Sequence, residues 1–207
     1  MRLVLIAIAG VILLAACSNE SQITGTTVKN PIIQQDDQAK SILFIVAQQD
    51  FRDEELRIPK EMFDREGHTV TIASPKGGIA TGMKGMSIET RSIKELVPDN
   101  YDIVAVIGGA GSQALADIAE VTNFIKSSHM NGKVIGGICL GPITLARAGV
   151  LKDKQATVFL NADSILALEE GGAIITAEEV VVDGRIVTAN GPKASENFAK
   201  ALLEVIE

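Results

Sequence analysis

The sequence of 207 residues has few of the side chains that metal centres, disulfide scaffolds and nucleic-acid interfaces require. It contains two cysteines, two histidines, six phenylalanines, one tyrosine and no tryptophan. Two cysteines exclude a disulfide-rich scaffold and a thiolate zinc site, and two histidines leave little room for a histidine-based metal centre. The net charge is −7, with no long basic run and few aromatic rings to stack on bases. We therefore expect no nucleic-acid partner, no metal and no cofactor.

The composition is that of a folded chain. Hydrophobic residues make up 46% and charged residues 22% of the sequence, which excludes a disordered protein. At this length one domain with a substantial core is the default expectation.

The N-terminus looks like a bacterial lipoprotein signal. A basic start is followed by an apolar run over 3–16, too short for a simple transmembrane helix, and then by Leu14-Ala15-Ala16-Cys17. We predict a signal peptide over 1–16 that is cleaved before Cys17, whose lipid would anchor the protein on an extracytoplasmic membrane face. An ordinary secretory signal or a short uncleaved anchor are the alternatives. The polar stretch 17–39 is interpreted as a flexible tether, and 40–207 as the folded domain.

Alternating strand and helix patterns fill the domain. Continuous apolar runs at 41–47, 69–73, 101–107 and 133–139 predict buried strands. Helices are predicted at 53–66 and 112–129, from the end of the 133–139 strand through 147, and at 162–169 and 194–206. Hairpins are predicted at 76–91 and around Asp183-Gly184, between strands at 179–182 and 185–188. This order favours an α/β fold with a mostly parallel sheet covered by helices on both faces.

Gly137-Ile138-Cys139-Leu140-Gly141 follows one of these strands and opens a helix. It has the form of a nucleophile elbow, in which small residues allow a sharp turn that exposes the central side chain. Nearby N–H groups and the helix N-terminus are expected to lower the pKa of the Cys139 thiol. An inert buried thiol is the alternative.

The turn after the preceding strand is also rich in glycine. From Gly109 it reads G-x-G-x-x-A, a weak variant of the dinucleotide-binding fingerprint. No acidic residue ends the next strand, which ends instead at Cys139, so nucleotide binding is disfavoured. A backbone N–H of the Gly108-Gly109 turn is better suited to stabilise an oxyanion beside the elbow.

Glu55 lies near the middle of the apolar face of the predicted helix 53–66, whereas Asp53, Glu54 and Arg57 lie outside it. A carboxyl on a buried face is costly unless it is paired or protonated. Acidic residues in a first turn also complement the helix dipole, an interpretation that suits Asp53 and Glu54 better than Glu55.

Several motifs in order resemble one family. They are Asp50-Phe51-Arg52-Asp53-Glu54-Glu55-Leu56 with Pro59, Val106-Ile107-Gly108-Gly109, Gly137-Ile138-Cys139-Leu140-Gly141-Pro142, Ala146-Arg147-Ala148-Gly149-Val150-Leu151 and Thr188-Ala189-Asn190-Gly191-Pro192. This set is similar to the PfpI/DJ-one family of the class I glutamine-amidotransferase-like superfamily, over about 40–206. The resemblance implies a flavodoxin-like three-layer α/β/α sandwich, a nucleophile at Cys139 and a protonated Glu55 that hydrogen-bonds to its sulfur. It also implies a dimer or larger homo-oligomer.

Histidine is missing where the family carries it. Leu140 stands where members proposed as proteases have a histidine, and the segment 157–160 also lacks one. His68 and His129 are interpreted as surface residues, so a Cys–His peptidase is disfavoured.

A cysteine–glutamate pair leaves two main hypotheses. Cys139 could attack a small reactive carbonyl compound, with Glu55 moving the proton and the N–H groups of Gly109 and Leu140 holding the oxyanion, in a glyoxalase- or deglycase-like role in stress protection. Alternatively, Cys139 is a non-catalytic oxidant sensor. A third possibility is a binding module in which this thiol is vestigial. The residues predicted to line the pocket are Arg52, Gly108, Gly191 and Pro192.

Overall fold

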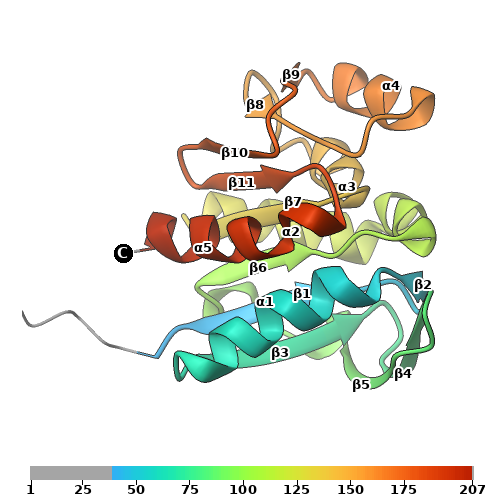
Figure 1. Cartoon of the computed structure of the whole chain (residues 1–207), viewed down its shortest axis with the longest axis vertical. Helices are drawn as coiled ribbons and strands as arrows, with labels where there is room; N and C mark the ends of the chain where they lie inside the picture. Colours follow the sequence, from blue (N-terminus) through green and yellow to red (C-terminus); the bar gives the residue numbers. More distant parts are fainter. Residues whose placement is uncertain (1–38, 207) are drawn as a thin grey trace, which may run out of the picture. The chain divides into compact units, whose positions relative to one another are not determined.

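Residues 39–206 are described by a computed structural model, and within them a nine-stranded sheet forms the centre (Figure 1). Its strand order is β10-β11-β7-β6-β1-β3-β5-β4-β2. The strands are β1 (Ser41–Ile45), β2 (Gln49–Phe51), β3 (Thr69–Ser74), β4 (Gly78–Gly82), β5 (Ser87–Ser92), β6 (Ile103–Val106), β7 (Val134–Ile138), β10 (Val180–Asp183) and β11 (Ile186–Ala189). The predicted signal peptide, the lipidated Cys17 and most of the tether lie outside the described residues.

The middle of the sheet is parallel. β11, β7, β6, β1 and β3 pair in parallel, while the β10–β11 and β4–β5 pairs are antiparallel. Every residue of β6 and β7 is buried, and so are four of the five residues of β1. Such continuous burial is expected of parallel strands that are covered on both faces, and it explains their uninterrupted apolar sequences.

Helices cover both faces of this sheet (Figure 1). α1 (Asp53–Arg65) and α5 (Ser195–Ile206) contact each other on one face, and α2 (Ala119–Met130) and α3 (Gly141–Arg147) contact each other on the opposite face. α4 (Ala162–Glu170) packs on α3, next to the small parallel pair of β8 (Gln155–Ala156) and β9 (Ile174–Ile175). The predicted α/β/α sandwich is confirmed.

Secondary structure differs from the prediction at 112–129 and at β2. The predicted helix 112–129 is instead a 3-10 helix, Ala110–Asp117, followed by an extended Ile118 and then by α2. Gly111 lies so close to the chain at Gln49 that a Cβ would come within 1.9 Å of the Gln49 carbonyl oxygen, so only glycine fits where this segment passes Gln49. The strand β2 was not predicted because it is short and polar, and it forms only by pairing with β4.

Strand order determines where a site can form. β1 pairs with β3 on one side and with β6 on the other, so the chain connections diverge at the carboxyl ends of β1 and β6. Ligands of open α/β sheets bind in the crevice at such a switch point.

Three short 3-10 helices complete the described elements besides Ala110–Asp117: Ile93–Glu95, Pro98–Asn100 and Pro192–Ala194. None of the helices in this part of the chain is both long and apolar enough to cross a membrane.

Candidate active site

Cys139 occupies the sharp turn between β7 and α3. Its φ is 60°, a left-handed conformation that is uncommon for a residue with a side chain. The backbone on both sides is fixed, because its N–H donates to the Ala189 carbonyl at 2.8 Å and its carbonyl accepts from the Phe159 N–H at 2.9 Å. Gly141 must be small, since a Cβ there would lie 2.4 Å from the Val106 carbonyl oxygen. The turn thus holds the thiol in a strained, defined position.

Glu55 reaches the same place from the first turn of α1. The residue is fully buried, and its Oε2 accepts a hydrogen bond from the Gly108 N–H at 3.0 Å. The other oxygen, Oε1, has no conventional hydrogen-bond partner within residues 39–206, although the Cys139 thiol is close enough to lower the pKa of the carboxyl. Burial outweighs these contacts and raises the pKa of Glu55 to about 7.

The prediction of a lowered thiol pKa is wrong. Burial and the negative charge of Glu55 raise the pKa of Cys139 to about 12. The N–H groups of Gly109 and Leu140 face the sulfur and act in the opposite direction, but they do not outweigh these two effects. The thiol and the carboxyl therefore compete for one proton, and a thiolate is favourable only while Glu55 is protonated.

A cavity of about 320 Å³ opens in front of the sulfur. It is lined by Arg52, Glu55, Met83, Gly109, Ala110, Cys139, Leu140, Phe159 and Pro192. A Cβ on Gly108 would meet both the Cys139 Cβ and the Glu55 carboxyl, and Gly191 lies beside the Phe159 ring. The structure thus brings every candidate site residue of the domain to one place.

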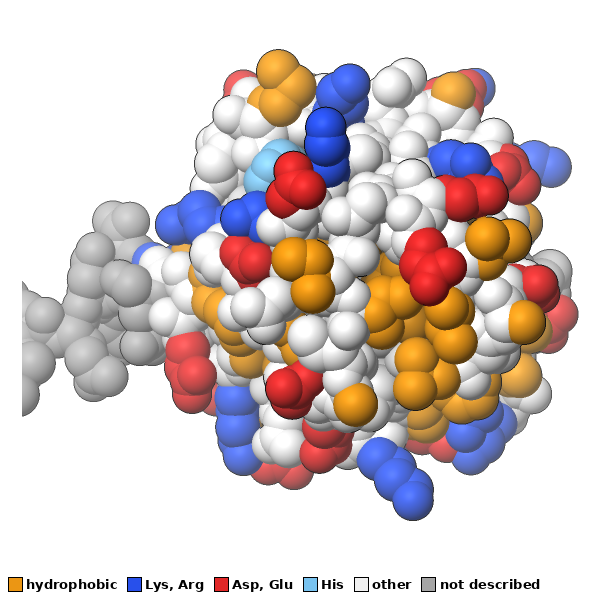
Figure 2. Space-filling model, turned by 90° about the horizontal axis from the view of Figure 1, so that it is seen from above, with side chains coloured by type: hydrophobic (Ala, Val, Ile, Leu, Met, Phe, Trp, Pro, Cys, Tyr) orange, Lys and Arg blue, Asp and Glu red, His pale blue; other side chains and the backbone are white. Residues whose placement is uncertain are grey.

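Sequence reasoning missed Met83 and Phe159. Met83 follows the edge strand β4, and Phe159 stands in the segment 157–160 where relatives were expected to have a histidine. Both side chains are about half exposed. Leu160 and Leu166, on the chain leading into α4 and in α4 itself, are exposed as well, and Figure 2 shows hydrophobic side chains gathered on the face seen from the α4 side. One wall of the cavity is thus apolar and open to solvent.

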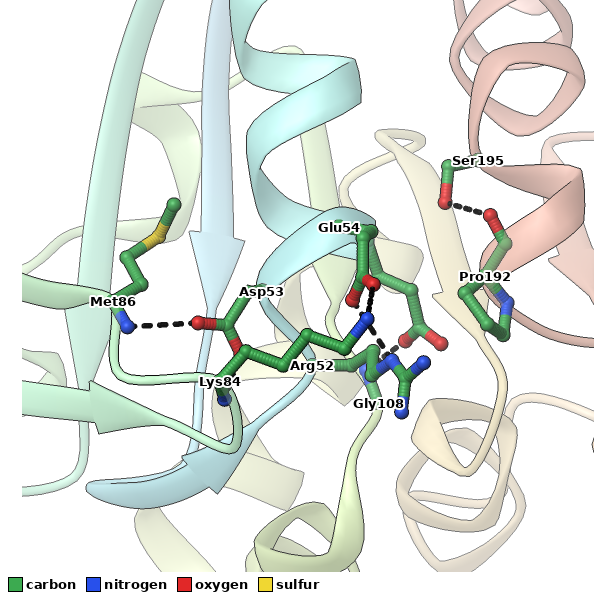
Figure 3. A network of polar contacts seen from close by, with 9 residues as sticks. Arg52, Asp53, Glu54, Lys84, Met86, Gly108, Pro192 and Ser195 are labelled. Atoms are coloured by element: carbon green, nitrogen blue, oxygen red, sulfur yellow. Dashed lines mark hydrogen bonds and ion pairs between the residues drawn. The ribbon is translucent and has the colours of Figure 1, made fainter.

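Charged groups cluster at the start of α1 (Figure 3). Glu54 pairs with Arg52, whose Nε lies 2.9 Å from Oε2, and also with Lys84. Asp53, predicted to lie outside the buried face, is in fact only 7% exposed. The β4–β5 hairpin covers Asp53. The carboxylate oxygens of Asp53 accept the N–H groups of Lys84 at 2.9 Å and Met86 at 2.8 Å. A helical wheel cannot show burial by a neighbouring element.

Neither histidine lines the cavity. The Nδ1 of His68 accepts a hydrogen bond from the Lys40 N–H, and its Nε2 lies 3.8 Å from Glu66. His129 lies at the end of α2. Among residues 39–206 no three His, Cys, Asp or Glu side chains are grouped as metal ligands. The arrangement offers a nucleophile, a carboxyl that can exchange a proton near neutral pH and two N–H donors, without an imidazole.

Comparison with known proteins places these features in context. Residues 40–205 match the DJ-1/PfpI family. The chain is 38% identical over 168 residues to the uncharacterized protein MJ0967 of Methanocaldococcus jannaschii, covering 80% of this chain and 82% of that protein. It is 32% identical over 152 residues to the deglycase PfpI of Pyrococcus furiosus, covering 73% and 90%. The crystal structure of a ThiJ/PfpI domain protein from Brachyspira murdochii superposes with a TM-score of 0.77 at 31% identity, covering 82% and 97%.

Proposed function

This chain belongs to the DJ-1/PfpI family, and from that premise we propose that it acts on small reactive carbonyl compounds through Cys139 and Glu55. A relative named as a deglycase supports this class of substrate. One observation carries the proposal: the thiol, a carboxyl with a pKa of about 7 and two backbone N–H donors all meet at one cavity.

The first step would be addition of the thiol to an aldehyde. The sulfur of Cys139 forms a bond to the carbonyl carbon of a 2-oxoaldehyde, and the carbon–oxygen double bond becomes a single bond. Glu55 accepts the thiol proton and returns it to the new oxygen, so that a neutral hemithioacetal results. The N–H groups of Gly109 and Leu140, which face the sulfur, would stabilise negative charge on that oxygen during the addition.

A carboxyl with a pKa of about 7 suits this role. Near neutral pH a substantial fraction of Glu55 is ionised and can accept a proton, while the remainder can donate one. The lack of a histidine in the cavity argues against a Cys–His peptidase, because the nucleophile would have no imidazole base.

Methylglyoxal consumption by the full-length protein tests the proposal. We expect turnover by the wild type, complete loss in Cys139→Ser, and a loss of about 100-fold or more in Glu55→Gln. The exposed variant Glu61→Gln on the same helix is the control. Turnover that survives in Cys139→Ser would refute the cysteine mechanism.

The second candidate is an oxidant sensor. Cys139 is the only cysteine of the described residues and has no disulfide partner there. Peroxide would convert the thiol to a sulfenic acid and water, and the same N–H donors could hold the new oxygen. Peptide mass spectrometry after peroxide titration separates the two: oxidation of Cys139 in a protein that consumes no methylglyoxal favours the sensor.

We also propose that Cys17 carries a lipid that holds the domain at an extracytoplasmic membrane face. The apolar run and the Leu-Ala-Ala-Cys ending support this proposal. Intact mass spectrometry of the membrane-extracted protein should show a chain that starts at Cys17 with added lipid. A protein of full-length mass would contradict it.

A further inference from the structure

We propose that Arg52 makes the cavity selective for carbonyl compounds that carry a carboxylate next to the reacting carbonyl, with glyoxylate as the simplest example. This inference deepens the proposed function and rests on it, because it assigns a substrate class to the same thiol. It starts from the charge of the lining: Arg52 is the one cationic side chain among the residues that line this cavity in the described part of the chain.

The backbone fixes Arg52 relative to the reacting groups. Its N–H donates to the Gly108 carbonyl at 2.9 Å, and the Gly108 N–H in turn donates to Glu55. The next residue, Gly109, is pressed against the same segment, since a Cβ there would lie 2.5 Å from the Arg52 nitrogen. The N–H of Gly109 also faces the sulfur. The backbone of Arg52 is therefore held against the same turn that contacts the Cys139 thiol.

The guanidinium group has hydrogen-bonding capacity to spare. Its Nε is in an ion pair with Glu54 but makes no hydrogen bond, and neither terminal nitrogen has a hydrogen-bond or ion-pair partner within residues 39–206. Glu54 also pairs with Lys84 (Figure 3), so one negative charge is shared between two cations. The side chain is 29% exposed, which leaves it accessible from the cavity.

A guanidinium whose two terminal nitrogens are free can bind a carboxylate in a bidentate manner, which a neutral ligand cannot reproduce. In glyoxylate the carboxylate and the aldehyde carbon are adjacent, so binding at Arg52 would hold the aldehyde beside Cys139. Addition forms the sulfur–carbon bond, and Glu55 passes the thiol proton to the aldehyde oxygen. The carboxylate is unchanged and stays on Arg52. The side chains of Met83, Phe159 and Pro192 in the same lining are apolar and offer such an anion no second cation.

Protection of Cys139 from iodoacetamide tests this proposal with glyoxylate and methylglyoxal as matched probes. The full-length protein is alkylated, and mass spectrometry of its peptides follows the modification of Cys139 separately from that of Cys17. We expect Arg52→Gln to weaken protection by glyoxylate about 10- to 100-fold more than protection by methylglyoxal. Arg52→Lys, which keeps the charge but not the bidentate geometry, should fall between Arg52→Gln and the wild type.

Lys84→Gln is the matched control, since Lys84 pairs with the same Glu54 but does not line the cavity. It should change protection by either probe no more than about threefold. Equal weakening of both probes in Arg52→Gln, or no weakening, would overturn the proposal. A different result would refute the proposed function, namely the absence of methylglyoxal turnover by the wild type. Arg52-dependent protection by glyoxylate would still support the selectivity in that case.

Discussion

The elbow around Cys139 and the first turn of α1 form the two sides of the same site in different ways. At the elbow, backbone hydrogen bonds and a missing side chain at Gly141 set the geometry. The first turn of α1 instead acts through the side chains of Arg52, Asp53, Glu54 and Glu55, three of them acidic. We infer that the geometry of the elbow is sensitive to added volume, whereas the helix turn responds to changes of charge.

The largest effect is expected where the two regions meet, at Gly108. A Cβ at this position would lie 2.5 Å from the Cys139 Cβ and 2.6 Å from the Glu55 carboxyl oxygen. Gly108→Ala should push the two groups apart and reduce the reactivity of the thiol toward carbonyl compounds about 100-fold, because displacements near 1 Å have such effects. Overpacking should also lower the free energy of unfolding by about 3 kcal/mol. Methylglyoxal turnover and urea unfolding measure the two losses.

Gly184→Ala is the control for this substitution. Gly184 stands in the β10–β11 turn with a φ of 60°, and a Cβ there would have no heavy atom within 4 Å. An alanine at this position should cost about 1 kcal/mol of backbone strain and leave the thiol unchanged. If Gly108→Ala behaves like Gly184→Ala, steric separation at Gly108 is not what limits the site.

The two regions also differ in how far the sequence predicts them. Local spacing was enough for the elbow, because the glycines around Cys139 and the strand–helix order specify a sharp turn without knowledge of distant residues. Glu55 was placed correctly on the buried face because α1 itself provides most of that face. Asp53 was misplaced because the β4–β5 hairpin buries it, and Met83 and Phe159 come from segments that only the strand order brings to the cavity. The pKa of Cys139 is raised by burial and then by the charge of Glu55, and no local pattern contains either effect.

The second prediction concerns the pH dependence of the helix turn. The pKa of Glu55 is raised from 4.5 to about 7 on folding, so between these values the folded state holds a proton that the unfolded chain has released. The wild type should therefore lose about 3 kcal/mol of unfolding free energy as the pH rises from 4.5 to 7, relative to Glu55→Gln. Urea unfolding at pH 4.5 and 7.5 measures this difference.

Glu54→Gln should show the opposite sign. The hydrogen bond from Lys84 and the charge of Arg52 lower the pKa of Glu54, so its contribution to stability is present above pH 4.5 and is lost as the pH falls below that value. If the wild type and Glu55→Gln respond to pH in parallel, Glu55 is not the group that titrates in this window.

The third prediction separates buried from exposed acidic groups. Asp53 accepts two backbone N–H groups from the hairpin, and an asparagine can offer only one acceptor oxygen. Asp53→Asn should lower the free energy of unfolding by about 2 kcal/mol and increase amide hydrogen exchange at residues 82–86. Asp64→Asn, which changes an exposed carboxylate on the same helix, should have little effect. Unchanged exchange in the hairpin would show that Asp53 does not hold it in place.

The smallest effect is expected from Lys84, whose two contacts allow a direct test of which kind of interaction fixes the helix turn. Its backbone N–H donates to Asp53, while its side chain, 57% exposed, pairs with Glu54. Lys84→Gln removes only the side-chain pair and should cost less than about 1 kcal/mol, since solvent and salt screen exposed ion pairs. The loss should shrink further at high salt in urea unfolding. A cost as large as that of Asp53→Asn would mean that the surface charges, rather than the buried carboxylate and its backbone donors, hold the hairpin against α1.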